Sequence, residues 1–150
     1  MTRRAGFTLI ELLIVMIVIG VLAALGVLRY IDVRNHAVAS GIVSELNVIR
    51  LAAYNHWADN ETFPPDAPAG VNPPSLDPYL RSGFSFTRLH HTFDWEHFPG
   101  ASAGMQAGVV VTSDSPALMS VLARRAAGGL PYFVVGNTLT FVIVGPDGNM

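Results

Sequence analysis

The sequence predicts an α+β fold in which one long N-terminal helix packs on a small antiparallel β-sheet. Three observations support this fold class. The 22 residues from Phe7 to Leu28 carry a single charged side chain, that of Glu11. No proline occurs before Pro64, so a helix can continue unbroken from the apolar segment. Beyond residue 80, short runs of β-branched and aromatic residues alternate with turn signals, which is typical of strands.

The helix is expected to run from residue 7 to residue 60 in two parts. Residues 7–29 are long and apolar enough to cross a hydrocarbon core of about 30 Å. Residues 30–60 are amphipathic, because apolar residues recur there every three or four positions and form one stripe. The stripe consists of Val38, Ile42, Leu46, Ile49, Ala53 and Trp57. We therefore expect the second part to pack against the sheet of a small domain, residues 61–150.

The domain should begin with a proline-rich connection that ends the helix, since six prolines lie within residues 62–79. Leu76, Tyr79 and Leu80 are expected to fix this connection onto the stripe. A short helix at 115–127 should start at Ser115-Pro116 and end at Gly128-Gly129, which are typical cap residues. Strands are expected at 84–89, 92–97, 106–112, 132–135 and 138–144, the last two joined by a two-residue turn at Gly136-Asn137.

Glu11 is the most informative residue of the apolar segment. An unpaired carboxylate inside a membrane span is unfavourable by about 2.5–3.5 kcal/mol on insertion scales. Gly6 and Phe7 precede it, and Arg3 and Arg4 stand before the glycine. This arrangement over residues 3–28 resembles the N-terminus of type IV prepilins and of the pseudopilins of type II secretion.

The resemblance implies a pilin-like roll and a defined processing pathway. Residues 1–6 would be a leader peptide that a prepilin peptidase removes after Gly6. Phe7 would become the N-methylated first residue. Glu11 would pair with the N-terminal amine of a neighbouring subunit, in agreement with the strong attraction of opposite charges in an apolar bundle. A simpler interpretation of Glu11 is that its carboxylate only reaches the headgroups from near the helix end.

An ordinary secretory signal is a rival interpretation of the same segment. Such a signal also has a positive start and an apolar core, and Ala23-Ala24 resembles a small-residue cleavage site. The charge at Glu11 and the length of the apolar stretch argue against it. Because Arg3 and Arg4 precede the span, they should remain in the cytoplasm. The protein is thus expected in the inner membrane as a single-pass subunit with a periplasmic domain.

Composition limits the functions of the outer domain. After cleavage, seven arginines would face eleven acidic residues, a formal net charge of −4. A basic footprint for nucleic acid is therefore absent. The chain has no cysteine, so no disulfide is expected on the oxidising side. No nucleophile with an adjacent base and no phosphate loop is recognisable, so we expect no enzymatic activity and no cofactor.

Two groups of residues are candidate metal ligands. His90, His91, Asp94, Glu96 and His97 lie close in sequence, but a strand at 92–97 would place His97 opposite Asp94 and Glu96. Plain surface residues are the favoured interpretation. Asp147 in the C-terminal turn is a weak calcium candidate, because calcium usually needs several carboxylates.

The sequence therefore predicts a structural subunit, processed after Gly6 and assembled with other pilin or pseudopilin subunits into a type IV pilus or a type II secretion pseudopilus. Cell-surface pilus and periplasmic pseudopilus both remain open, as do the roles of major and minor subunit. The alternative is a membrane-anchored binding module that does not polymerise, with the aromatic segment 84–98 as its working surface.

Overall fold

The computed structural model describes residues 7–98, 106–127 and 131–145. The chain divides into two compact units, residues 1–35 and residues 36–150. Helix α1 (Leu9–Asn60) supplies the described helix of the first unit and the longest element of the second.

The sequence expectation of a long helix is confirmed, with its start at Leu9 instead of Phe7. The helix continues through Gly20 and Gly26, although glycine costs about 1 kcal/mol relative to alanine inside a helix. A side chain at either glycine would meet no other atoms within 4 Å in the single chain. Nothing within the described chain therefore requires glycine at these two positions.

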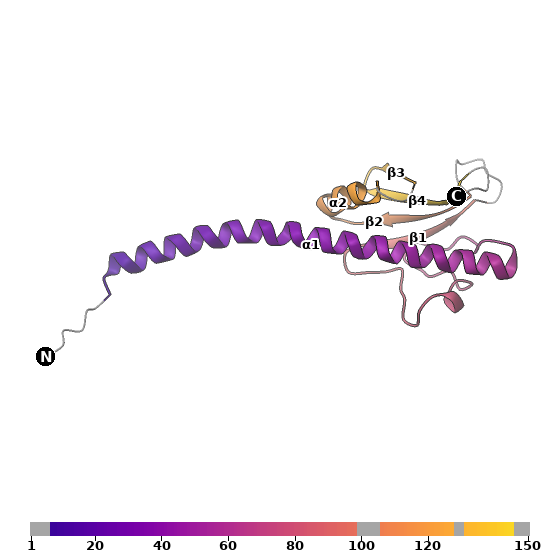
Figure 1. The fold of residues 1–150 in the computed structure, drawn as a ribbon, viewed down its shortest axis with the longest axis horizontal. Helices are drawn as coiled ribbons and strands as arrows, with labels where there is room; N and C mark the ends of the chain where they lie inside the picture. The colour runs from indigo at the N-terminus through magenta and orange to yellow at the C-terminus, as the bar shows by residue number, and fades with distance from the viewer. Residues whose placement is uncertain (1–6, 99–105, 128–130, 146–150) are drawn as a thin grey trace. The chain divides into compact units, whose positions relative to one another are not determined.

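In the second unit, four strands form one antiparallel sheet in the order β1-β2-β4-β3 (Figure 1). Their bounds are Thr92–His97 for β1, Ala107–Thr112 for β2, Tyr132–Val135 for β3 and Thr138–Val144 for β4. The four corresponding sequence predictions are confirmed to within a residue. β3 and β4 are joined by Gly136-Asn137, and Gly136 has φ +60°, as a tight hairpin turn requires.

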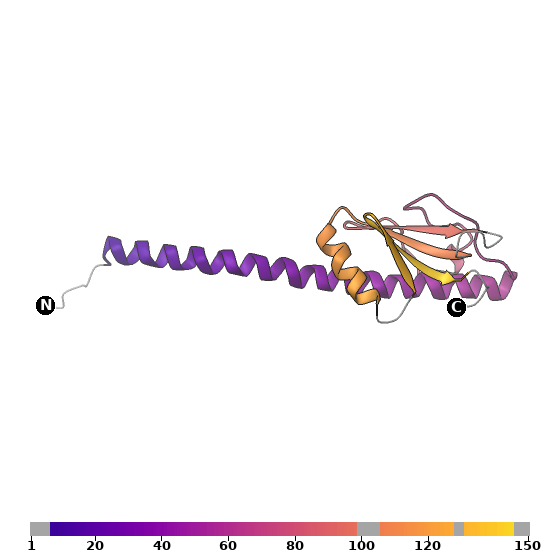
Figure 2. The same cartoon turned by 90° about the horizontal axis from the view of Figure 1, so that it is seen from above.

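Helix α2 (Pro116–Ala126) connects β2 to β3 and lies at one end of the sheet (Figure 2). Its start is built as expected, because the Ser115 side chain accepts a hydrogen bond from the Leu118 N–H and Pro116 occupies the first turn. The predicted stop at Gly128-Gly129 lies outside the described residues.

The core of the second unit lies between the sheet, α2 and the part of α1 that follows His36. From α1, Ile42, Leu46, Ile49 and Ala53 of the predicted stripe are buried. Trp57 does not belong to the stripe, since it is 48% exposed and the preceding His56 is buried in its place. The largest fully buried side chains are Trp95, Phe86, Phe93 and Phe141.

The shift from Trp57 to His56 has a local cause. The His56 ring nitrogen Nδ1 lies 2.8 Å from the Thr62 carbonyl oxygen, which ties the helix end to the following loop. Trp57 instead stacks on Phe63, with ring centroids 6.4 Å apart. The loop that follows the helix thus decides which side chain is covered.

The connection from residue 61 to residue 91 contains one short 3₁₀ helix, η1 (Asp77–Tyr79). Leu76 and Leu80 are buried and Tyr79 packs against the core, as the sequence predicted. The predicted strand at 84–89 is wrong. This segment makes only an isolated bridge, Thr87 to Thr92.

Asn72 explains the missing strand. Its side-chain amide donates to the Phe84 carbonyl (2.9 Å) and accepts from the Phe86 N–H (2.9 Å). One side chain therefore satisfies backbone groups that a neighbouring strand would otherwise bond. Phe84 and Phe86 still alternate toward the core, which is the pattern that suggested a strand.

Candidate functional site

The candidate site lies at the start of α1. Phe7 is described and 79% exposed, and Glu11 lies in the first turn of the helix and is also exposed. The predicted leader, residues 1–6 with Gly6, lies outside the described residues. Among the described residues, Glu11 is the charged side chain nearest in sequence to Phe7, the first residue of the predicted mature chain, and lies four positions after it.

Thr8 and Glu11 form a reciprocal cap on the helix. The Glu11 carboxylate oxygen Oε2 accepts hydrogen bonds from the Thr8 backbone N–H (2.8 Å) and from its hydroxyl Oγ1 (2.6 Å). In return, the Glu11 N–H donates to Thr8 Oγ1 (3.3 Å). This is the capping-box arrangement, which satisfies backbone donors that a helix start leaves unpaired.

The capping role of Thr8 was not among the sequence predictions. The signal was present, because Thr8-Leu9-Ile10-Glu11 has the Thr-x-x-Glu spacing of a capping box before an apolar run. Glu11 therefore acts as a helix cap as well as a charge in the apolar segment. The structure gives Glu11 a partner within its own helix before any other subunit is present.

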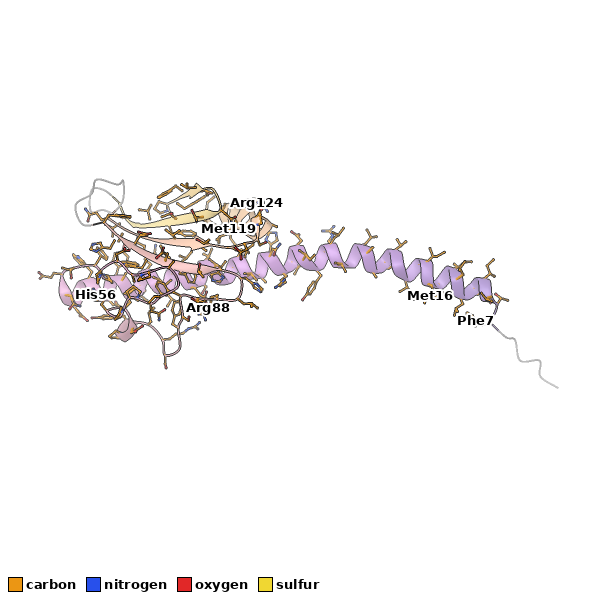
Figure 3. The ribbon with its side chains drawn as sticks, turned by 180° about the vertical axis from the view of Figure 1, so that it is seen from behind. Phe7, Met16, His56, Arg88, Met119 and Arg124 are labelled. Carbon is orange, nitrogen blue, oxygen red and sulfur yellow. The ribbon has the colours of Figure 1, made fainter. Side chains whose placement is uncertain are left out.

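The helix surface after Glu11 is apolar on every side. Large apolar residues from Leu12 to Val33 are all about half exposed or more, and the side chains of Phe7 and Met16 project from the ribbon with nothing packed over them (Figure 3). The most apolar 18-residue stretch of α1 has a mean hydropathy of 2.8, and none of it is buried. By length and composition, this helix qualifies as a membrane span.

The residues considered for metal binding do not converge. His91 approaches Glu45 of α1, and the His90 carbonyl accepts from Ser113. Asp94 and Glu96 lie on the face of β1 opposite Phe93 and Trp95. Within residues 7–98, 106–127 and 131–145, no group of three histidine, aspartate or glutamate side chains has a geometry suited to a metal. Asp147 lies outside these ranges.

The outer face of β1 is weakly acidic instead. Burial raises the pKa of Asp94, and the charge of Asp66 raises it further. Burial also raises the pKa of Glu96, with added repulsion from Asp94 and Asp66. These two side chains are half-buried, although the strand pattern predicts that they face solvent. The His97 ring lies 6.4 Å from that of Phe63, and burial lowers the pKa of His97.

Comparison with known proteins identifies a family motif in the N-terminal segment. Residues 1–27 match the family described as the prokaryotic N-terminal methylation motif. The chain is 33% identical over 85 residues to the type II secretion system core protein G of Klebsiella pneumoniae. It is also 29% identical over 132 residues to the type IV major pilin protein PilE1 of Neisseria gonorrhoeae. The chain therefore carries the prepilin-type N-terminal motif and is similar to type IV pilins and to type II secretion pseudopilins.

Coverage of these pilin-family relatives is partial. The match to protein G spans 55% of this chain and 61% of the relative, and the match to PilE1 spans 88% of this chain and 58% of the relative. A fimbrial protein of Pseudomonas aeruginosa is 42% identical over 53 residues, 35% of this chain and 34% of its own. The chain thus spans about three-fifths of the first two relatives. No solved structure gave a significant match.

Proposed function

We propose that the protein is a prepilin-like structural subunit that a prepilin peptidase cleaves after Gly6 and that then joins other pilin or pseudopilin subunits in a filament. Phe7 becomes the N-methylated first residue. Before assembly, residues 7–29 hold the subunit in the inner membrane with the domain on the periplasmic side. The protein has no enzymatic role and is instead the substrate of the processing enzymes.

The observation that carries this proposal is the combination of an uncovered apolar helix surface with one charge at its start. For a helix that only anchors a domain, the cap formed by Glu11 contributes about 1 kcal/mol, which is less than its charge costs in a membrane. In a filament, the carboxylate has a partner, because the N-terminal amine of a neighbouring subunit lies in the same apolar environment. The pair would also fix the register of head-to-tail packing, which gives an open helical polymer.

The capping role of Glu11 gives a sharp experiment, because the cap and the charge can be removed separately. Glu11→Gln keeps a side-chain oxygen for the Thr8 N–H, since glutamine also serves in a capping box, but removes the charge. Thr8→Val keeps the charge and removes the hydroxyl that makes two of the three capping bonds. Filaments sheared from cells are quantified for each variant, and processing is followed by the mass of the cellular protein.

We expect Glu11→Gln to be processed normally and to lower the assembled fraction by at least about tenfold. Removing one partner of a buried ion pair costs about 3–5 kcal/mol. We expect Thr8→Val to lower assembly less, because a lost cap costs about 1 kcal/mol. If Glu11→Gln is processed and assembles like the wild type, the charge has no role in assembly and the proposal is wrong.

The alternative, a membrane-anchored binding module, needs an exposed aromatic surface at residues 84–98. Four of the five aromatic side chains there are buried, and Trp95 donates its ring N–H to the Pro64 carbonyl (3.0 Å). Only Phe98 is partly exposed, at 38%. These aromatics form the domain core, so the structure gives this alternative no working surface in that segment.

A further inference from the structure

A cluster of three charged or titratable side chains joins the loop before β1 to helix α1 within the second unit. Glu45 of α1 forms an ion pair with Arg88, in which Arg88 Nη2 lies 2.8 Å from Glu45 Oε1. Its other oxygen, Oε2, lies 3.3 Å from His91 Nε2. Arg88 and His91 stand at the two ends of one turn, which the Arg88 N–H closes on the His91 carbonyl (3.0 Å). We call Glu45, Arg88 and His91 the Glu45 cluster.

His91 is enclosed although it is titratable. Its side chain is only 8% exposed, and its ring packs edge-on against Phe93 with centroids 4.8 Å apart. Nδ1 is buried and has no hydrogen-bond partner among the described residues. In the neutral ring, Nε2–H donates to Glu45 and Nδ1 keeps only a lone pair. Protonation would add a buried Nδ1–H donor without an acceptor, and such a donor costs about 1–3 kcal/mol.

The charges around His91 offset only part of that cost. Glu45 attracts a proton onto the ring, but Arg88 already pairs with this carboxylate at 2.8 Å. Arg88 and His90 on the same turn oppose a second positive charge. Phe93 of β1 is uncharged. Burial, the largest effect, lowers the pKa of His91.

We propose that the Glu45 cluster is a pH-sensitive connection that holds the 88–91 turn on α1 when His91 is neutral and releases it when His91 is protonated. Arg88 lies on the segment that runs beside α1 (Figure 3). A shallow groove separates this turn from α1 and is lined on the helix side by Val38, Gly41 and Ile42. Release would widen this groove in acid.

The sign of the pH dependence follows from the difference in proton binding between the folded and the released states. Because the folded pKa of His91 lies below the ordinary value of about 6.5, the unfolded or released state binds more protons in this range. The stability of the connection is therefore complete above pH 6.5 and falls as the pH is lowered through the folded pKa. The Ser113 hydroxyl, which donates to the His90 carbonyl (2.6 Å), does not titrate and should keep the turn attached to the β2 side. The change is thus local to the contact with α1.

Hydrogen exchange of the full-length protein in detergent micelles tests this proposal. Peptides covering residues 86–91 are compared at pH 7.5 and pH 5.5, with each rate divided by the intrinsic rate at that pH. In the wild type, we expect these peptides to exchange up to about tenfold faster at pH 5.5 than at pH 7.5. Tenfold is the upper limit because pH 5.5 lies about one unit below the ordinary histidine pKa of about 6.5, which applies in the released state. Peptides covering β2 and β4 should show no such change.

Two matched substitutions assign the effect to a residue. His91→Gln retains a donor toward Glu45 and does not titrate, so its exchange ratio should not depend on pH. His90→Gln makes the same change one position earlier and should keep most of the wild-type response, because the charge of His90 has the smallest effect on His91. Equal protection of the wild type at both pH values overturns the proposal, as does a pH response that persists in His91→Gln. If His91→Gln does not fold, the wild type and His90→Gln still decide, because loss of the response in His90→Gln would also overturn it.

Discussion

The two parts of α1 use the same kinds of apolar residue in opposite ways. Between Leu9 and Val33, isoleucine, leucine and valine are exposed on every side of the helix. After His36, most of the same residue types are covered by the sheet and its connections, and Leu51, 62% exposed, is the exception. The second part is therefore stabilised by its own chain, and the first part needs an environment that the single chain does not provide. A membrane and a bundle of neighbouring helices both supply such an environment.

The largest expected difference between the parts is the cost of removing an apolar side chain. Ile49 is fully buried and Ile17 is 59% exposed. Ile49→Ala should lower the free energy of unfolding of the domain by about 2–5 kcal/mol, because it leaves a cavity in the core. Ile17→Ala should change it by less than about 0.5 kcal/mol. Denaturant unfolding followed by tryptophan fluorescence in detergent micelles measures both, and similar losses for the two variants would contradict the distinction.

The two helix caps give a smaller contrast of the same kind. Ser115 caps α2 through its bond from the Leu118 N–H (3.3 Å), and Thr8 caps α1. Ser115→Ala should destabilise the domain by about 1 kcal/mol. Thr8→Ala should leave domain unfolding unchanged, because that cap stabilises only the first unit. A loss of domain stability in Thr8→Ala would show that the two units unfold together.

The smallest effect concerns the half-buried acids on β1. Because the pKa of Glu96 is raised in the folded protein, the folded state binds more protons than the unfolded state between the unfolded and folded pKa values. Stability thus decreases as the pH rises through this window above about pH 4.3. Glu96→Gln should stabilise the domain at pH 7 by a few tenths of a kcal/mol, since solvent screens the group. The gain should vanish below pH 4.

Thermal unfolding at pH 7 and at pH 3.5 measures this difference. Glu61→Gln is the matched control, because Glu61 lies in the exposed turn that ends α1. A gain in Glu61→Gln equal to that in Glu96→Gln would assign the effect to net charge instead of to the position of Glu96.

The sequence predicted those elements whose signals are local. Ser115-Pro116 places the start of α2, and Gly136-Asn137 places the β3–β4 turn, because each cap or turn is decided by neighbouring residues. The prediction of a strand at 84–89 was wrong because the group that satisfies its backbone lies far away in the sequence. Its backbone is satisfied by Asn72, more than ten residues earlier, and no local pattern reports such a partner.

The candidate site and the Glu45 cluster show the same difference between short-range and long-range signals. Glu11 stands out in the sequence because it is a charge in an apolar run, and its bond with Thr8 follows from a short-range spacing. The cluster of Glu45, Arg88 and His91 joins residues more than 40 positions apart. Its members look like ordinary surface residues in the sequence, so only the fold brings them together.

The most direct test of the central claim is the N-terminal peptide of the protein isolated from cells, identified by mass spectrometry. A peptide that begins at N-methylated Phe7 is the predicted result, since it requires both cleavage after Gly6 and modification of the new terminus. An intact Met1 would indicate a permanent anchor, and a start near Ala24 would indicate a secreted protein. Either of these results would contradict the proposal of a filament subunit.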